Sequence, residues 1–171
     1  MTRTADTTSQ INLRQATDAD LDAINKVIER AVHTWKLPER VKRLAMSSYL
    51  YNEHDLHHLH IELAEDRAAG VIGVAAWESA AARDCPKGRR GLLLHGLYVD
   101  PDSQRRGTGT RLLSAAAEAA REQDYDGLLV KAQADAEGFF RSQGLQQLAV
   151  ADAERDYPHR FWLDLAQRNN A

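Results

Sequence analysis

The chain of 171 residues is 43% hydrophobic and 27% charged, with a net charge of −3 at pH 7. This length can fill one domain with a sizeable core, and the slightly acidic charge argues against a nucleic acid bound through bulk electrostatics. The single cysteine, Cys85, excludes an internal disulfide and fits a reducing compartment, which favours a cytoplasmic protein.

Residues 1–9 are polar and lack the apolar run of a signal peptide, so we expect a disordered tip there and one domain over residues 10–171. No stretch approaches the length of a membrane span, and a membrane is therefore not an expected partner.

Residues 11–14 alternate like a short strand, and Thr17 with Asp20 resembles a capping box. The helix that follows is expected to pack inward through Leu21, Ile24, Val27, Ile28 and Ala31.

A second helix is expected to start near Pro38, because proline suits the first helical turn. Its apolar positions are Val41, Leu44, Ala45 and Leu50. Residues 58–64 and 71–78 are predicted as two strands joined by a hairpin turn over residues 66–70. The histidines of this region are His54, His57, His58 and His60. Histidine is a common metal ligand, but no cysteine or carboxylate spacing completes a site, so exposed or packing histidines are favoured and no metal is expected.

Residues 82–88 form a polar loop, in which Cys85 is an incidental thiol more readily than a nucleophile. The remaining elements are predicted as a strand over residues 91–99, a helix ending at about residue 123, a strand over 127–132, a short helix over 135–143 before Gly144, and strands over 148–150 and 159–165. The resulting order, β-α-α-β-β-β-α-β-α-β-β, indicates one α+β domain.

The loop before the long helix is rich in features that bind anions. A helix start offers unpaired N–H groups and partial positive charge. Gly107 and Gly109 let a bulky anion approach the backbone, and Arg105 and Arg106 add cationic donors. A dinucleotide fingerprint needs a third glycine where Leu112 stands, and a Walker loop needs a Gly-Lys-Ser/Thr that is absent. The loop therefore predicts a different phosphate site, with a plain strand-to-helix turn as the alternative.

Gln104-x-x-Gly107-x-Gly109 directly follows a strand ending in Val99-Asp100-Pro101. This segment resembles the acetyl-CoA-binding motif, Gln/Arg-x-x-Gly-x-Gly/Ala, of the GCN5-related N-acetyltransferases, the GNAT superfamily. The element order is similar to the GNAT fold over nearly the whole chain. The resemblance implies a central mixed, mostly antiparallel sheet whose parallel central strands splay apart, flanked by helices.

Residues 130–145 resemble a second segment of that family, strand-Asn-x-x-Ala-x-x-Phe-Tyr-x-x-x-Gly-Phe. Its matching positions are Ala136, Phe139 and Gly144. Gln133 replaces the usual Asn and Leu145 the usual Phe. Phe140 stands where many members carry a tyrosine that acts as general acid toward the leaving thiolate. A phenylalanine cannot donate a proton, so that role is vacant.

The resemblance implies acetyl-CoA as the acyl donor, with other donors such as succinyl-CoA left open. Main-chain groups of Leu97, Tyr98 and Val99 would pair with the pantetheine arm, and a backbone N–H near Leu97 would polarise the thioester carbonyl. N–H groups across residues 105–110 would bind the pyrophosphate. The further cofactor-binding residues are Gln104, Arg105, Arg106, Gly107, Thr108, Gly109, Thr110, Gln133 and Phe140.

Transfer to an amine requires a neutral amine and hence a general base. His95 is the leading candidate because it is expected to share a strand face with Leu93, Leu97 and Val99, close to the thioester; a core histidine is the alternative. Glu78 is a second candidate, either as a base or as a carboxylate that attracts the cationic substrate. The alternative is that it faces solvent at the end of its strand. Tyr157 is a candidate for the general acid that is missing at Phe140. The alternative is that Tyr157 packs in the structure and a water molecule donates the proton.

Two positions are open for the aromatic residues Trp35, Tyr49 and Tyr51. We expect them either to line the acceptor side of the site or to pack in the core. The favoured function is an N-acetyltransferase that acts on a primary amine of a small molecule or peptide by direct attack in a ternary complex. The alternative, favoured by Phe140, is a non-catalytic acyl-CoA sensor on the same fold. No nucleic-acid partner is expected, and the resemblance leaves a homodimer open.

Overall fold

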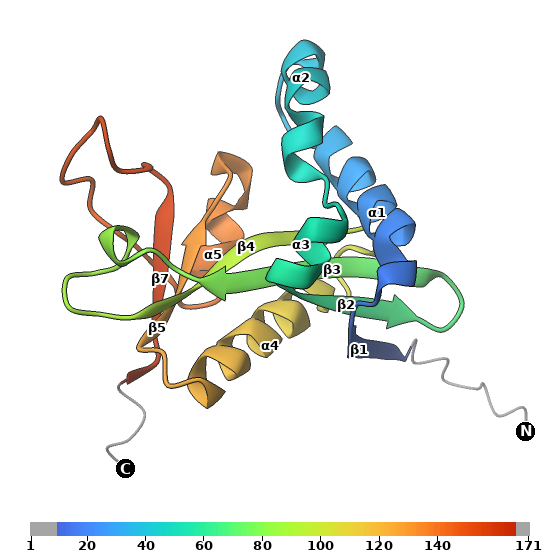
Figure 1. The fold of residues 1–171 in the computed structure, drawn as a ribbon. Helices are drawn as coiled ribbons and strands as arrows, with labels where there is room; N and C mark the ends of the chain where they lie inside the picture. The colour runs from blue at the N-terminus through green and yellow to red at the C-terminus, as the bar shows by residue number, and fades with distance from the viewer. Residues whose placement is uncertain (1–9, 167–171) are drawn as a thin grey trace, which may run out of the picture.

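The computed structural model describes residues 10–166 of the chain (Figure 1). The expected disordered tip, residues 1–9, lies outside the described residues. A seven-stranded sheet forms the centre of the molecule, with the order β1-β2-β3-β4-β5-β7-β6. The strands are β1 (Ile11–Gln15), β2 (His60–Asp66), β3 (Gly70–Ser79), β4 (Gly91–Val99), β5 (Gly127–Lys131), β6 (Gln146–Gln147) and β7 (Arg160–Asp164). The helices are α1 (Leu21–His33), α2 (Glu39–Tyr49), α3 (Glu53–His58), α4 (Thr108–Glu122) and α5 (Glu137–Ser142).

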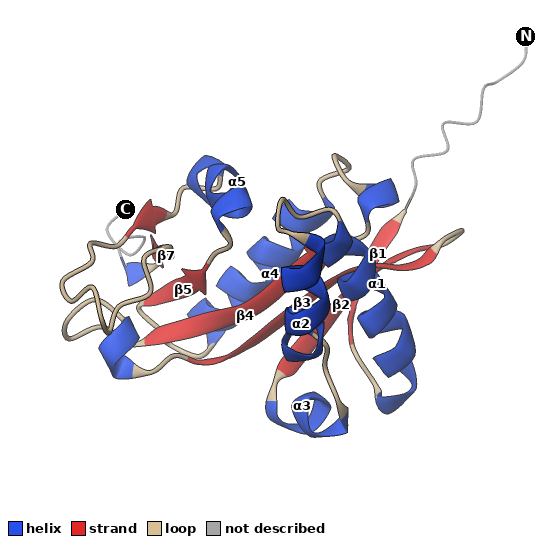
Figure 2. Cartoon of the chain, turned by 90° about the horizontal axis from the view of Figure 1, so that it is seen from above, coloured by secondary structure: helices blue, strands red, loops and turns tan. Residues whose placement is uncertain are grey.

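The pairing of the strands confirms the predicted α+β fold. Strands β4 and β5 run parallel in the centre, whereas the flanking described pairs are antiparallel. Helices α1 and α3 cover one face of the sheet and α4 covers the other (Figures 1 and 2). Helices α1 and α4 each bury one stripe, as their periodicity predicts, through Ile24, Val27 and Ile28 on α1 and through Leu112 and Ala116 on α4.

Helix α3 was not predicted as a separate element. It begins after Asn52, whose side chain accepts the N–H of Asp55, while the Asp55 carboxylate accepts the N–H of Asn52. This Asn-x-x-Asp pair is a readable helix start, but six residues are too few for a periodic apolar stripe.

Helix α2 starts after Pro38 as predicted, and Leu50 at its end packs against the core, but two of its expected apolar positions face solvent. Val41 is 44% and Leu44 71% exposed, because α2 projects away from the sheet (Figure 1). The buried residue of this helix is Lys42, whose Nζ donates to the carbonyl of His33 at 2.8 Å and pairs with Glu39. A lysine can be buried in this way because its ammonium group is fully engaged.

The strand predicted over residues 148–150 is wrong, since β6 lies two residues earlier at Gln146–Gln147. Its residues pair with Trp162 and Phe161 of β7. Beyond it the N–H of Leu148 still donates to the carbonyl of Arg160 at 2.8 Å, but the carbonyl of Ala149 accepts from the buried guanidinium of Arg160 instead of from a backbone N–H. The Arg160 side chain therefore takes the place of the ladder that the apolar run suggested.

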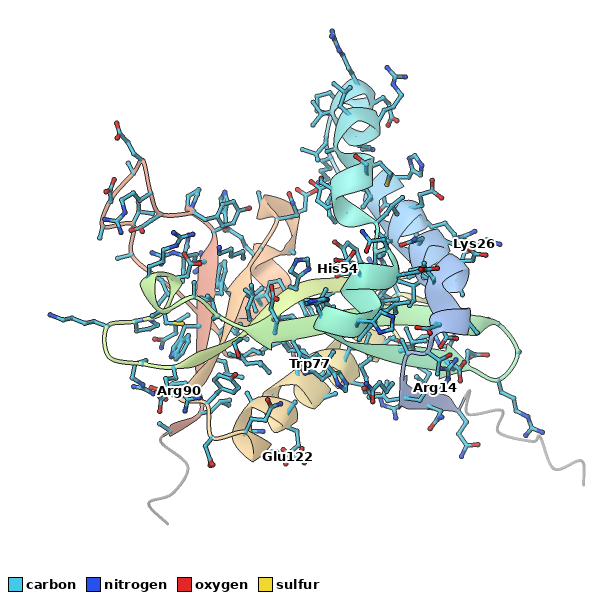
Figure 3. The ribbon with its side chains drawn as sticks, in the orientation of Figure 1. Arg14, Lys26, His54, Trp77, Arg90 and Glu122 are labelled. Carbon is cyan, nitrogen blue, oxygen red and sulfur yellow. The ribbon has the colours of Figure 1, made fainter. Side chains whose placement is uncertain are left out.

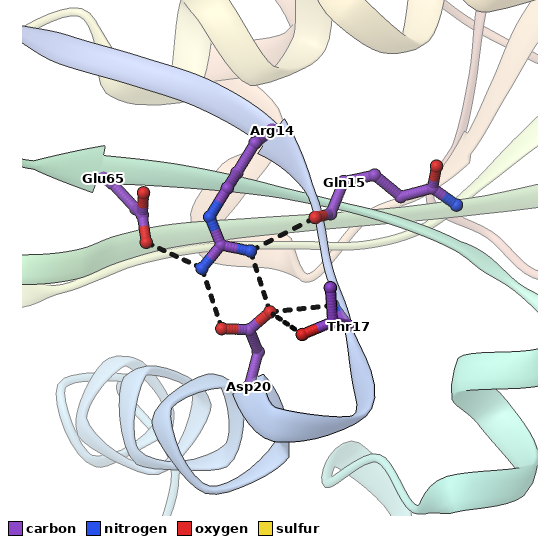
Figure 4. A network of polar contacts seen from close by, with 5 residues as sticks. All are labelled: Arg14, Gln15, Thr17, Asp20 and Glu65. Atoms are coloured by element: carbon purple, nitrogen blue, oxygen red, sulfur yellow. Dashed lines mark hydrogen bonds and ion pairs between the residues drawn. The ribbon is translucent and has the colours of Figure 1, made fainter.

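Arg14 joins the first strand, the first turn and β2 through one polar network (Figure 4). Its guanidinium donates to both oxygens of Asp20 at 2.8 Å and to Glu65 at 2.7 Å. Asp20 also accepts the N–H of Thr17 at 2.7 Å, which confirms the predicted capping interaction. The hydrogen bond from Arg14 holds the pKa of Asp20 well below the usual range of a carboxyl group.

Asp20→Asn is expected to lower the free energy of unfolding by about 1–3 kcal/mol at pH 7, the usual contribution of a hydrogen bond to a charged group. A depressed folded pKa stabilises the protein fully above the unfolded pKa of about 4 and progressively less as the pH falls below it. The difference in free energy of unfolding between wild type and variant should therefore be smaller at pH 3. Urea unfolding at both pH values measures it, with Asp18→Asn in the same turn as the control; an equal gap at both values would contradict the assignment.

Candidate functional site

A bulge in β4 places His95. Across the ladder with β3, Gly96 pairs with Ala76 while Leu94 pairs with Trp77, so His95 is the inserted residue. A bulge shifts the alternation of side chains by one residue beyond it. The expectation that His95 shares a face with Leu97 and Val99 is therefore wrong.

The two faces of β4 can be assigned from their contacts. Leu97 packs against the core that contains α4, whereas Tyr98 belongs to the core beneath α1. His95 lies on the α1 side with Tyr98, since its Nδ1 is 3.4 Å from the hydroxyl of Tyr51, another member of that core. The adjacent Gly96 faces the same side, because a Cβ there would lie 2.5 Å from the Tyr51 hydroxyl. Glycine is thus required for Tyr51 to reach His95.

Tyr51 and Tyr98 are neutral phenols under physiological conditions. Burial raises the pKa of Tyr98 to about 12 and raises that of Tyr51 further above the ordinary value. His95, in contrast, is exposed and lines a cavity of about 790 Å³. Its imidazole therefore has a buried hydroxyl on one side and open space on the other.

The cavity lies where the parallel strands separate. β4 and β5 are paired from Gly91 opposite Gly127 to Leu94 opposite Val130, and their described ladder ends there. From His95 to Val99, β4 keeps its bonds to β3 but pairs with no described strand on its β5 side. The splay that the resemblance implied is thus present, and it leaves main-chain groups free to bind an extended ligand.

The glycine loop closes one end of this cavity. Gly107 has φ +76°, a left-handed conformation that favours glycine, and α4 begins at the next residue. Thr108 lines the cavity and is 2% exposed, yet its hydroxyl has no hydrogen-bond partner among the described residues. A buried hydroxyl beside the free N–H groups of a helix start is suited to an anionic ligand.

The two arginines of the loop differ in position. Arg105 lines the cavity, whereas Arg106 does not and pairs with Asp66 at 2.6 Å. Asp66 ends β2 and also accepts the N–H groups of Ala68 and Ala69 in the hairpin turn. Arg106 therefore links the loop to the hairpin, and Arg105 is the arginine of this pair that faces the cavity.

The structure brings most of the sequence-predicted residues together around the cavity. They are His95, Leu97, Tyr98, Val99, Gln104, Arg105, Gly107, Thr108, Gly109, Thr110, Gln133 and Phe140. Glu78 is exposed and does not line the cavity, standing opposite Leu93 in the ladder. Tyr157 also lies outside the lining and donates its hydroxyl hydrogen to the carbonyl of Ala132 at 2.7 Å, while partial burial raises its pKa.

Two charged lining residues were not predicted, Lys131 at the end of β5 and Asp135 in the turn after it. Their position just beyond the carboxyl end of a central parallel strand was the available signal. Of the aromatic residues expected on the acceptor side or in the core, Trp35 and Tyr49 line the cavity, whereas Tyr51 packs in the core. The sequence alone left these two outcomes open.

Burial and local hydrogen bonds account for Cys85 and for the histidines of the cluster. Cys85 is buried, and burial raises the pKa of its thiol, which disfavours a nucleophile. His54 lies on α3, on the side of the sheet opposite α4 (Figure 3), and its carbonyl is bonded to the ring of His58. His60 pairs with Glu62.

Within residues 10–166, no three or more potential ligands are grouped as a metal site, and no helix is long and apolar enough to cross a membrane.

Comparison with known proteins agrees with this geometry. A family model described as the acetyltransferase (GNAT) domain matches residues 24–157. No curated protein matches the sequence significantly.

Solved structures resemble the fold over most of the chain. A GNAT family acetyltransferase from Brucella melitensis, in complex with acetyl-CoA, is 17% identical with a TM-score of 0.61, over 92% of this chain and 89% of the other. A putative GNAT acetyltransferase from Desulfovibrio desulfuricans is 18% identical with a TM-score of 0.66, over 91% and 99% of the two chains. PaiA N-acetyltransferase from Thermoplasma acidophilum, in complex with coenzyme A, is 14% identical with a TM-score of 0.68, over 90% and 96%.

Proposed function

The chain belongs to the GNAT family of acetyltransferases, and from this premise we propose that it transfers an acetyl group from acetyl-CoA to a primary amine by direct attack in a ternary complex. The observation that carries the proposal is the continuity of one cavity. The cavity runs from the loop at Gly107 along the free edge of β4 to His95.

The residues at the loop fit the phosphates of the donor. The first N–H groups of α4, the unpartnered hydroxyl of Thr108 and the guanidinium of Arg105 are donors that would hold a pyrophosphate. Gly109 leaves the approach to them open, because the nearest atoms to a Cβ there belong to Phe139 at 3.4 Å. Main-chain groups of Leu97 and Val99 would bond the amides of the pantetheine arm.

Acetyl-CoA would supply a thioester whose carbonyl carbon the amine attacks. His95 accepts the proton that the amine must lose, and a main-chain N–H near Leu97 stabilises the negative charge that develops on the carbonyl oxygen. The new C–N bond forms as the C–S bond breaks. Phe140 has no proton for the departing thiolate, and Tyr157 lies outside the cavity, so solvent supplies that proton.

Phe140 supports a second candidate function, an acyl-CoA sensor without turnover. Its side chain lines the cavity but is 5% exposed and packs near Phe161 in the core, and its ring has no proton to donate. Such a sensor keeps the phosphate site and lacks the chemistry. We place either function in the cytoplasm, because the chain's one thiol is free and buried.

Thermal unfolding with and without acetyl-CoA tests both candidates. A donor about 100-fold above its Kd stabilises the native state by about 2.7 kcal/mol, or roughly 5–10 °C in Tm for a chain of this size. Release of free CoA thiol in the presence of an amine panel then separates the enzyme from the sensor. No rise in Tm at millimolar acetyl-CoA would exclude both, and a rise without thiol release would exclude the enzyme.

A further inference from the structure

An aromatic wall flanks His95 on the acceptor side of the cavity. Trp35 makes an edge contact with Tyr49 at a ring-centroid distance of 5.1 Å and an angle of 81°. Trp35 also lies nearly parallel to Tyr98, with centroids 6.2 Å apart and an angle of 18°. All three rings line the cavity, and Tyr98 stands on the same face of β4 as His95. We propose that the acceptor is an aromatic monoamine, a primary amine on an aromatic body without a carboxylate.

Hydrogen bonds within the protein hold the wall in place. The backbone N–H of Lys36, next to Trp35, donates to the carboxylate of Asp135 at 3.0 Å. This bond joins the segment after α1 to the turn after β5, on the other half of the splayed sheet. The N–H of Trp35 itself donates to the carbonyl of Val32 at 3.0 Å. Rings positioned by the protein's own bonds reduce the entropy cost of ordering them around an acceptor.

The geometry of the rings favours an aromatic body. Aromatic side chains prefer offset-stacked and edge-to-face contacts at centroid distances of about 4.5–7 Å, and both kinds occur in this wall. A further ring can extend such a cluster in either arrangement. The wall also attracts the protonated form of an amine through its ring faces while that amine approaches His95.

The charges in the cavity disfavour amino acids and polyamines. Among the described lining residues, the basic side chains other than His95 are Arg105, on the phosphate loop, and Lys131, whose ammonium pairs with Asp84 at 3.0 Å. Neither is free to hold a substrate carboxylate beside the rings. The one lining carboxylate, Asp135, already accepts the N–H of Lys36, whereas a polyamine would need several such groups.

The inference rests on the proposed function, so its test separates the two. Thiol release from acetyl-CoA is measured with 2-phenylethylamine, with phenylalanine, which adds only a carboxylate, and with spermidine. We expect kcat/KM for 2-phenylethylamine to exceed both others at least tenfold. A higher value for phenylalanine or spermidine would overturn the acceptor class and leave the acetyltransferase intact.

Variants of the wall give a second readout. Trp35→Leu and Tyr49→Leu are expected to raise KM for 2-phenylethylamine at least tenfold without changing the Kd of CoA. Tyr125→Leu is the matched control, because Tyr125 lies outside the cavity and bonds Ser79. An unchanged KM in both wall variants would overturn the inference.

If no amine releases thiol although CoA binds, the acceptor pocket is tested by binding in place of turnover. Calorimetry then measures the binding of 2-phenylethylamine to the CoA complex. Binding that is weakened in Trp35→Leu would then support the acceptor pocket, even though the proposed reaction had failed. No binding would exclude the pocket as well.

Discussion

Gly109→Leu is expected to raise the Kd of acetyl-CoA about 100-fold or more and to abolish the thermal shift, because it should cost two or more charge-assisted hydrogen bonds to the phosphates. Gly109 is the second residue of α4 and lines the cavity, and a Cβ there would have ordinary spacing to Phe139 and Val99. A leucine there fills the approach to the helix start. Calorimetric titration with CoA measures the effect.

The control for this variant is Gly138→Leu, the same change inside another helix. Gly138 belongs to α5, no atom lies within 4 Å of its Cβ position, and it is outside the cavity lining. Its Kd for CoA should match that of the wild type. Gly107 is a poorer test, since its φ of +76° makes any substitution strain the backbone even without a ligand. Full CoA affinity in Gly109→Leu would place the phosphates elsewhere.

The position of the loop before α4 could be predicted from sequence because its features are local. The order of strand, Gln104, Gly107 and helix indicates the helix start within a few residues. The strand ended at Val99 and the long helix at Glu122, close to the positions that periodicity indicated. Phe140 could likewise be placed from a short motif.

The position of His95 relative to its neighbours could not be predicted in this way. A bulge is a property of two paired strands, and the mainly apolar sequence of β4 alone does not show where the alternation of faces shifts. The role of Arg106 depends on Asp66, forty residues earlier, and the exclusion of Tyr157 depends on a bond to Ala132. These contacts between distant segments decided which of the predicted polar residues face the cavity.

His95→Ala is expected to lower kcat/KM for the amine about 100-fold or more, within the usual contribution of a general base. It should also remove the acidic limb of the pH profile, because only the neutral ring accepts a proton. His95→Gln retains hydrogen bonding without basicity and should behave in the same way. The Kd of acetyl-CoA should stay unchanged in both variants, since the proposed phosphate contacts lie at the loop.

The hydrogen bond to Tyr51 makes this prediction more specific. For His95 to accept a proton at Nε2, its Nδ1 must carry the hydrogen, and the Tyr51 hydroxyl, 3.4 Å away, must then be the acceptor. Because burial keeps Tyr51 a neutral phenol at physiological pH, ionisation of its hydroxyl does not contribute to that limb. His57→Ala, an exposed histidine of α3 outside the cavity, is the control and should keep the wild-type profile. An acidic limb that persists in His95→Ala would assign the base to another group.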